Sequence, residues 1–253
     1  MSLMRLVRGA GFVLIAAAML LIGAWCSVAA WYGCGAGEPV RSLMAGAAAV
    51  FTFSAVTLLP TRMRWPAFAV YSGAVAVFLA WWATISPASN RDWAPDVART
   101  LTATIDGDRV VLSNVRNFNW RSETLFDPIW EQRTYNLSRV TDVDLIMSYW
   151  MGETIAHTIV SFGFDDGSRL AFSIETRKEN RESYSSIAGF FQQYELSIIA
   201  ADERDVVRVR SNIRGGDVRI YRLRMTPENA QLFCASTSRK PMSWRSRRAS
   251  TIR

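Results

Sequence analysis

The sequence is poor in the residues from which small secreted proteins build disulfides and metal sites. Among 253 residues it has three cysteines, at positions 26, 34 and 234, and one histidine, His157. Cys26 and Cys34 lie in or beside the first long apolar run, so no disulfide framework is implied for the rest of the chain. One histidine with cysteines so remote cannot form the usual zinc site. No nucleotide-binding glycine loop is present either, and we expect no metal and no cofactor.

Charge is missing from most of the first ninety residues. Asp, Glu, Lys, Arg and His are absent from residues 9–37, 42–61 and 65–90. A helix needs about 20 apolar residues to cross about 30 Å of hydrocarbon. Three windows approach or reach that length, at residues 11–32, 43–60 and 66–85. These runs exclude a single-domain soluble enzyme and predict a three-helix membrane anchor over residues 1–88.

The arginines beside these windows predict an orientation. Arg5 and Arg8 precede the first window, Arg62 and Arg64 lie between the second and third, and the other short loop has only Arg41. Cytoplasmic loops are the ones enriched in Lys and Arg, so we expect a multi-pass inner-membrane protein with a cytoplasmic N-terminus. The residues after 86 would then be periplasmic. The alternative for the first window is a cleaved signal peptide with its small residues at 27–29, which leaves the same location for the rest of the chain.

The net charge of +7 does not come from the part of the chain expected to fold outside the membrane. Residues 91–234 carry 18 basic and 21 acidic side chains, whereas residues 235–253 carry six basic side chains and no acidic one. Nucleic-acid binding needs a clustered basic face on a folded surface, so we expect no nucleic-acid partner. The composition of residues 234–253 predicts a basic disordered tail.

The pattern of residues 89–233 predicts a β-rich domain. Short segments rich in Val, Ile, Phe and Tyr alternate with turn residues, as strands do, and Asp106-Gly107 is a strong hairpin signal. Helices are expected near residues 184–193 and after Pro227, where proline suits a first turn. We predict an α+β protein with three N-terminal transmembrane helices. The expected strands are residues 101–105, 109–113, 132–137, 140–150, 155–164, 169–176, 195–200, 206–212 and 218–223.

His157 is the main candidate for chemistry. If Asp165-Asp166-Gly167 forms a three-residue hairpin loop, His157 faces Glu175, and a carboxylate in that position fixes the tautomer of a histidine base. A two-residue turn would place His157 opposite Thr176 instead. A lone histidine on a buried strand is more often a core residue, and a cross-strand polar pair contributes under about 1 kcal/mol. The charged run from Asp202 to Asp205 is likewise more typical of a solvated salt-bridge network.

Several motifs in order resemble the Lnb N-terminal periplasmic domain family, over roughly residues 89–232. The motifs are Asn117-Phe118-Asn119-Trp120-Arg121, Trp150-Met151-Gly152, Ala156-His157-Thr158 with Ser161-Phe162, Ser173-Ile174-Glu175-Thr176-Arg177-Lys178-Glu179, Asp202-Glu203-Arg204-Asp205 and Val209-Arg210. The resemblance implies a domain like that of a bacterial lipoprotein N-acyltransferase, with a fold similar to a circularly permuted papain-like thiol enzyme.

The same resemblance implies roles for individual residues. It makes His157 the general base of acyl transfer. With the hairpin register we predict His157 and Glu175 as catalytic residues and Ser173, Arg177, Asp202 and Arg204 as substrate-binding residues, with lipid or lipoprotein acyl groups as the expected partners. Family members continue to an Asn-Cys-Thr stretch whose cysteine is the nucleophile. That stretch is missing here and Cys234 stands in another context, so we expect a C-terminally truncated, inactive relative.

Two functions therefore stay open. One is a thiol acyltransferase or hydrolase that lacks its nucleophile, and the other is a non-catalytic membrane-tethered module that binds an envelope ligand or partner. Whether the chain is an enzyme is thus undecided by its residues. No pattern in the sequence indicates an oligomeric state.

Overall fold

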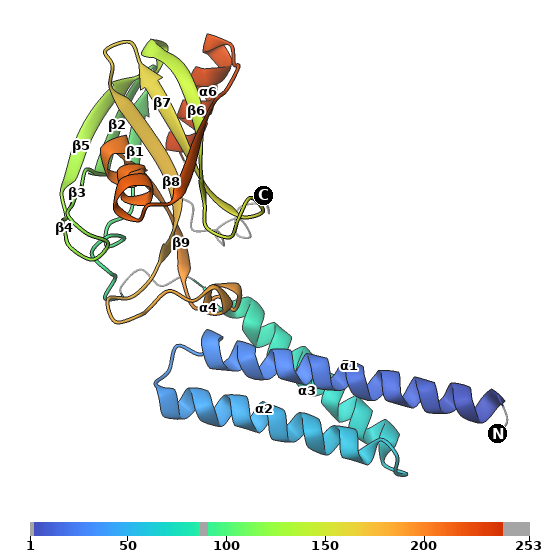
Figure 1. Ribbon diagram of the computed structural model, residues 1–253. Coiled ribbons are helices and arrows are strands. Elements are labelled where there is room, and N and C mark those ends of the chain that lie inside the picture. Colours follow the sequence, from blue (N-terminus) through green and yellow to red (C-terminus); the bar gives the residue numbers. More distant parts are fainter. Residues whose placement is uncertain (1–2, 87–90, 240–253) are drawn as a thin grey trace. The chain divides into compact units, whose positions relative to one another are not determined.

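The computed structural model describes residues 3–86 and 91–239, and the chain divides into two compact units. The first comprises Met1–Pro87 together with the segment Tyr184–Tyr194. The second comprises the remaining residues and contains the sheet (Figure 1). Mixed α and β structure with three long N-terminal helices confirms the predicted fold class.

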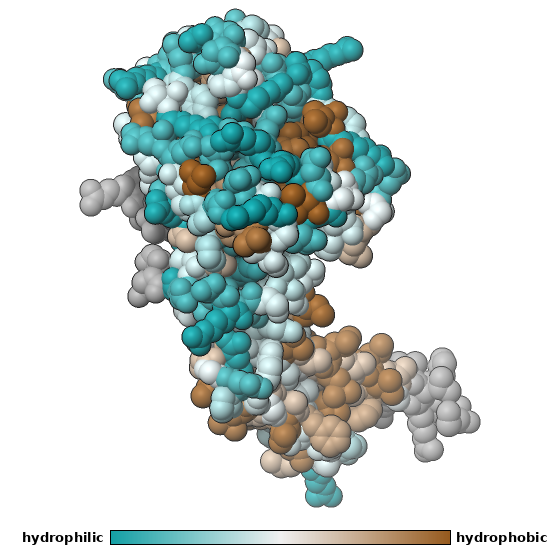
Figure 2. All heavy atoms as spheres, turned by 60° about the vertical axis from the view of Figure 1, so that its left-hand side comes forward, coloured by the Kyte–Doolittle hydropathy of each residue, from teal (hydrophilic) through white to brown (hydrophobic). Residues whose placement is uncertain are grey.

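The first unit is built on three apolar helices, α1 (Leu3–Gly33), α2 (Glu38–Leu58) and α3 (Arg64–Thr84). Within them, Gly9–Gly33, Glu38–Leu58 and Arg64–Thr84 are long and apolar enough to cross a membrane, in agreement with the three expected windows. The buried hydroxyl of Tyr71 donates to the carbonyl of Met19 at 2.7 Å and joins α3 to α1. Apolar side chains cover the outside of these helices (Figure 2), as lipid-facing helices require.

The second unit is organised by an eight-stranded sheet in the order β1-β2-β9-β8-β7-β6-β10, with β5 paired to β2. All neighbours are antiparallel except β2 and β9, which meet in parallel at Arg116 and Ala201. A separate two-stranded sheet joins β3 and β4. The strands are β1 (Thr102–Asp106), β2 (Arg109–Arg116), β3 (Asn119–Trp120), β4 (Phe126–Asp127), β5 (Trp130–Asn136), β6 (Val140–Tyr149), β7 (Ala156–Phe164), β8 (Arg169–Arg177), β9 (Glu195–Ala201) and β10 (Asp217–Arg222).

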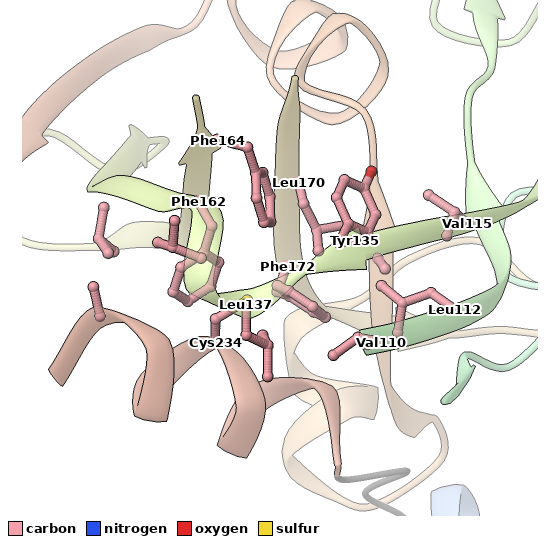
Figure 3. Packing of buried hydrophobic residues seen from close by; sticks show 14 of the residues in the cluster. Val110, Leu112, Val115, Tyr135, Leu137, Phe162, Phe164, Leu170, Phe172 and Cys234 are labelled. Atoms are coloured by element: carbon pink, nitrogen blue, oxygen red, sulfur yellow. The ribbon is translucent and has the colours of Figure 1, made fainter. Parts of the chain in front are cut away.

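Both faces of the sheet are partly covered. On one face, helix α6 (Pro227–Ser238) packs against a core that includes Phe162, Phe172 and Leu170 (Figure 3). On the other face, Ile159, Ile199 and Val206 belong to a smaller core. Because side chains alternate along a strand, neighbouring residues of β7 serve opposite cores. His157 lies on the face of the smaller core.

One predicted strand is wrong. Residues 206–212 are not extended: the chain forms helix α5 (Glu203–Val206) and then a π-helical turn, η2 (Val209–Ile213). Buried Val206 and Val209 are three residues apart, which is a helical spacing, although their β-branched side chains favour a strand. The side chain of Asp202 accepts from the backbone N–H of Arg204 and caps α5, as an N-cap aspartate does.

The predicted start of the C-terminal tail also needs correction. Helix α6 does not stop at residue 233 but continues to Ser238, and both Cys234 and Ser238 are buried. Residues 234–238 therefore belong to the folded unit. The rest of the expected tail, residues 240–253, lies outside the described residues, as does the expected boundary at residues 88–89. Helix α4 (Ser186–Phe190) and helix α6 occur where helices were expected.

Candidate functional site

The hairpin of β7 and β8 sets the position of His157 relative to Glu175. Its three-residue loop holds Gly167 in the left-handed region, with φ of +80°, as this type of connection requires. The two strands then pair with Ile159 opposite Ser173, and the same register places His157 opposite Glu175. Side-chain alternation brings His157, Ser173 and Glu175 onto one face. Of the two registers that the sequence allowed, the first is present.

A serine hydroxyl stands between the histidine and the carboxylate. His157 Nε2 lies 2.6 Å from Ser173 Oγ, and Ser173 Oγ donates to Glu175 Oε1 at 2.6 Å. The direct distance from His157 Nε2 to Glu175 Oε1 is 3.4 Å. An ionised carboxylate can only accept a hydrogen bond, so the single hydroxyl hydrogen of Ser173 goes to Glu175. His157 Nε2 must then carry a hydrogen and donate to Ser173.

Arg210 completes this cluster from the neighbouring helical turn. Its Nη2 donates to Glu175 Oε1 at 2.6 Å, and its Nη1 donates to the carbonyl of Val206 at 2.8 Å. The same Nη2 is 3.1 Å from His157 Nε2, but both atoms are donors in this arrangement, so we count the bond to Glu175 only. We call His157, Ser173, Glu175 and Arg210 the histidine cluster.

The backbone around Arg210 explains how its side chain reaches the sheet. Arg210 belongs to the π-helical turn η2, a rare form that is frequent at functional sites. Its carbonyl accepts from the N–H of Gly216 at 2.9 Å. A Cβ atom at position 216 would lie 3.0 Å from that carbonyl oxygen, so the close approach favours glycine. Gly215, with φ of +63°, makes the turn that allows it.

The electrostatics of the histidine cluster favour an ionised Glu175. Burial alone raises the pKa of this carboxyl, but the Arg210 guanidinium and the hydrogen-bonding and charge contributions of His157 outweigh burial. The pKa of Glu175 is therefore held well below its usual range. A guanidinium that donates to a shielded carboxylate gives one of the stronger protein hydrogen bonds.

The cluster is open to solvent through its histidine. The side chain of His157 is 27% exposed and that of Glu175 is 17% exposed, whereas Ser173 and Arg210 are buried. All hydrogen-bond contacts of the imidazole within the described part of the chain are made by Nε2. With Nε2 donating, the neutral imidazole presents the lone pair of Nδ1. A histidine held by one nitrogen with the other free is arranged as a general base.

A second buried charge organises the neighbouring loops. The carboxylate of Asp205 accepts from Arg116 at 2.7 and 3.2 Å, from the Phe118 N–H at 3.0 Å and from Trp120 Nε1 at 2.7 Å. Burial lowers the pKa of Arg116, but the charge of Asp205 outweighs it and the pKa is raised. Asp205 thus fastens the loop after β2 to helix α5. The run from Asp202 to Asp205 is not simply a solvated network, because its last residue is buried.

The structure does not bring the other predicted substrate residues into the histidine cluster. Asp202 caps α5 and pairs with Arg133 at 3.0 Å, and Arg204 donates to Asn117 at 2.6 Å. Arg177 is buried, donates to the carbonyls of residues 97 and 98 and lies over the ring of Trp93 at 4.2 Å. Each of these three residues is thus bonded to other parts of the protein, and its contact with a substrate stays a prediction. Only Ser173 of the predicted substrate residues touches His157, and it does so as a hydrogen-bond partner.

Arg210 and Arg116, which bind the carboxylates of Glu175 and Asp205, are not among the site residues predicted from the sequence. Arg210 lies 35 residues from Glu175 in the chain, and Arg116 lies 89 residues from Asp205. Both arginines stand in or beside the motifs that carried the family resemblance. That resemblance was the one signal that could have singled them out.

Cys234 does not serve the histidine cluster. It belongs to the core between α6 and the sheet (Figure 3), whereas His157 lies on the opposite face of the sheet. Burial raises the pKa of the Cys234 thiol to about 12, so the reactive thiolate form is scarce at neutral pH. Within residues 3–86 and 91–239, no group of three His, Cys, Asp or Glu side chains is placed to hold a metal ion.

Comparison with known proteins finds a match to one family model in the second half of the chain. Residues 126–245 match the family model of the Lnb N-terminal periplasmic domain. This is the family that the motifs resemble, so the match confirms the resemblance over that range. Together with the three helices that are long and apolar enough to cross a membrane, it supports a membrane-associated protein with a periplasmic domain. The match contains the whole histidine cluster and Asp205, and it begins after the Asn117–Arg121 motif. No curated protein and no solved structure matched the chain.

Proposed function

We propose that this chain is a multi-pass protein of the inner membrane whose periplasmic domain binds acyl groups of lipids or lipoproteins beside His157. Residues 1–88 are the anchor, with the N-terminus in the cytoplasm, as the arginine distribution favours. The domain is related to thiol-dependent acyltransferases and hydrolases. The observation that carries this proposal is the imidazole of His157, which is fixed through Nε2 while Nδ1 faces no protein partner among the described residues.

His157 supplies the acid–base half of acyl transfer. Nδ1 accepts the proton of an attacking thiol as its sulfur bonds to the acyl carbonyl carbon, and the same proton then passes to the leaving oxygen or nitrogen. Ser173 and Glu175 hold the imidazole ring in place and stabilise the imidazolium while it carries the proton. Arg210 keeps Glu175 ionised, so the carboxylate does not take the proton itself.

Ser173 is a positioning residue and not the nucleophile. Its hydroxyl lies close enough to His157 for the serine–histidine pair of a hydrolase. However, the side chain is buried, and its hydrogen is directed at Glu175. A nucleophile must reach the carbonyl carbon of a substrate, and a hydroxyl enclosed by a histidine, a glutamate and an arginine does not. The fold instead uses Ser173 to connect the two charged groups.

We propose that the domain of this chain binds acyl groups but neither transfers nor hydrolyses them. The cysteine of the sheet unit, Cys234, is buried under α6 with a raised pKa. Without a thiol beside Nδ1, the base has no nucleophile to activate. A non-catalytic binding module is the alternative, in which the histidine cluster only shapes the surface.

An added thiol distinguishes an acyltransferase-like domain that lacks its nucleophile from a non-catalytic binding module. The full-length chain in detergent is given p-nitrophenyl butyrate, with and without 2-mercaptoethanol. The thiol attacks the ester to form a thioester and release p-nitrophenol, and His157 carries the proton between them. We expect little turnover without thiol and a several-fold faster, saturable transfer with it, which is lost in His157→Ala and kept in the control Thr158→Ala on the opposite face.

Two results would count against the proposal. Equal rates for the wild type and a folded His157→Ala variant would favour the binding module, provided that a fluorescent acyl probe still binds. Turnover without added thiol that is abolished by Cys234→Ala would mean that this cysteine does reach the histidine.

A further inference from the structure

The segment Tyr184–Tyr194 links β8 to β9 and contains helix α4 (Figure 1), and it is held by its own internal hydrogen bonds. The side chain of Ser185 accepts from the N–H of Ala188 at 3.3 Å and caps helix α4. The N–H of Ser185 donates to the hydroxyl of Tyr194 at 3.0 Å, and the rings of Tyr184 and Tyr194 stack with centroids 6.1 Å apart. Ala188 is buried. The segment thus has a fixed inner side.

Its outer side is apolar and uncovered. Ile187 and Phe190 stand three residues apart, so they project from one side of α4. Ile187 is 60% exposed and Phe190 is 75% exposed, the highest fraction among the large apolar side chains of the described residues. Large apolar side chains that are exposed side by side mark a surface that contacts a partner or a membrane.

The next residue ties the segment to the end of a membrane span. The ring of Phe191 stacks on Tyr32 with centroids 6.0 Å apart and lies 6.2 Å from Trp25. Both residues belong to α1: Tyr32 stands at the end of the candidate span Gly9–Gly33, and Trp25 stands about two helical turns before it. Trp and Tyr at the ends of spans sit at the level of the lipid headgroups. Phe191 therefore places the segment at that level.

We infer that Tyr184–Tyr194 is an interfacial lipid-binding element, with Ile187 and Phe190 inserted among the lipids of the leaflet at the C-terminal end of α1. The occupant is lipid because the exposed side chains are continuous with an aromatic contact at the end of a span. Apolar side chains carried on a short helix at the headgroup and acyl boundary are typical of interfacial elements. This inference is independent of any chemistry at His157.

The test places a fluorophore on the segment in a bilayer. Phe190→Cys is made in a Cys34→Ser background, since Cys26 and Cys234 are buried, and is labelled with an environment-sensitive nitrobenzoxadiazole dye. The matched control is Leu125→Cys, an apolar residue of the sheet unit that is 54% exposed. Both full-length proteins are reconstituted in phosphatidylcholine and phosphatidylethanolamine vesicles with lipids spin-labelled near the headgroup.

We expect the dye at position 190 to show blue-shifted emission and at least twofold stronger quenching by the spin-labelled lipid than the dye at position 125. Ile187→Ser in the same protein should reduce that quenching. Quenching by aqueous iodide at position 190 as strong as at position 125 would overturn the inference. Protection from both iodide and spin-labelled lipid would also overturn it, because protein, such as a second copy of the chain, would then cover Phe190.

Discussion

His157 Nε2 lies 2.6 Å from the hydroxyl oxygen of Ser173, whose hydrogen is donated to Glu175. In this arrangement the protein contacts the imidazole through Nε2, and Nδ1 makes no hydrogen bond among the described residues. The arrangement also explains why His157 and Glu175, which the register places opposite each other, are 3.4 Å apart and not in a direct short bond. The histidine is neither an ordinary core residue nor half of a simple surface pair.

Glu175→Gln should destabilise the protein at neutral pH, because it leaves the buried Arg210 guanidinium without its carboxylate. Removing one partner of a buried ion pair costs about 3 kcal/mol, or roughly 6–12 °C in Tm for a domain of this size. Because the pKa of Glu175 is lower in the folded state, its stabilisation is fully present above the unfolded value of about 4.3 and is lost as the pH falls below it. Thermal unfolding in detergent between pH 7 and pH 3 should show the two Tm values converging at the acid end.

The exposed Glu153, paired with Arg219, provides the control. Glu153→Gln should lower Tm much less than Glu175→Gln does, since exposed ion pairs contribute little to stability. A Glu175→Gln variant as stable as Glu153→Gln at pH 7 would contradict the role given to the Arg210 contact.

Asp205→Asn should be among the most destabilising single-atom changes in the sheet unit. The amide cannot accept from Arg116, Phe118 and Trp120 together, and Arg116 would stay buried without a counter-charge. We expect a loss of about 3–5 kcal/mol, measured as the fall in Tm. Asp127→Asn, which removes an exposed pair with Arg121, should change Tm little. Similar small shifts for both variants would show that Asp205 does not hold the loops together.

Cys234 should behave as an inert core thiol. Its pKa is raised to about 12 by burial, so a thiol reagent such as dithionitrobenzoate should modify it only after unfolding. Cys34, which is half-buried, should react faster in the same protein. The measurement is the time course of modification in the native protein and in denaturant, with Cys234→Ala to assign the slow phase. Rapid native-state reaction at Cys234 would mean that α6 opens readily.

The orientation follows from the arginines beside the spans and is tested by fusion. A phosphatase that is active only when exported, joined after Arg239, should be active in cells, whereas the same enzyme joined in the loop at Arg62 should be inactive. The opposite pair of results would place the histidine cluster in the cytoplasm.

Much of the fold was predictable because local patterns determined it. The charge-free runs gave the three helices, and Gly167 in a three-residue loop gave the register that brings His157 to Glu175. The strand predicted for residues 206–212 is wrong, since Val206 and Val209 have strand propensity while the cap at Asp202 and burial against the sheet select a helix.

The rest of the histidine cluster depends on contacts that no local pattern encodes. Arg210 reaches Glu175 across 35 residues because a π-helical turn and the close approach of Gly216 aim its side chain at β8. Asp205 meets Arg116 across 89 residues for a similar tertiary reason. In the sequence Asp205 is the last of four charges in a row, which is typical of a solvated surface, whereas Arg116 and Arg210 are single arginines between uncharged neighbours.

The tautomer of the single histidine tests the central claim most directly. Because His157 is the one histidine in the sequence, isotope-labelled histidine in a protein purified without a histidine tag gives one pair of ring-nitrogen NMR signals. For the neutral imidazole, we predict a protonated Nε2 and an unprotonated Nδ1, with this preference weakened in Ser173→Ala. A protonated Nδ1 with an unprotonated Nε2 in the wild type would contradict the account, because the nitrogen assigned to chemistry would then be the one that holds the hydrogen.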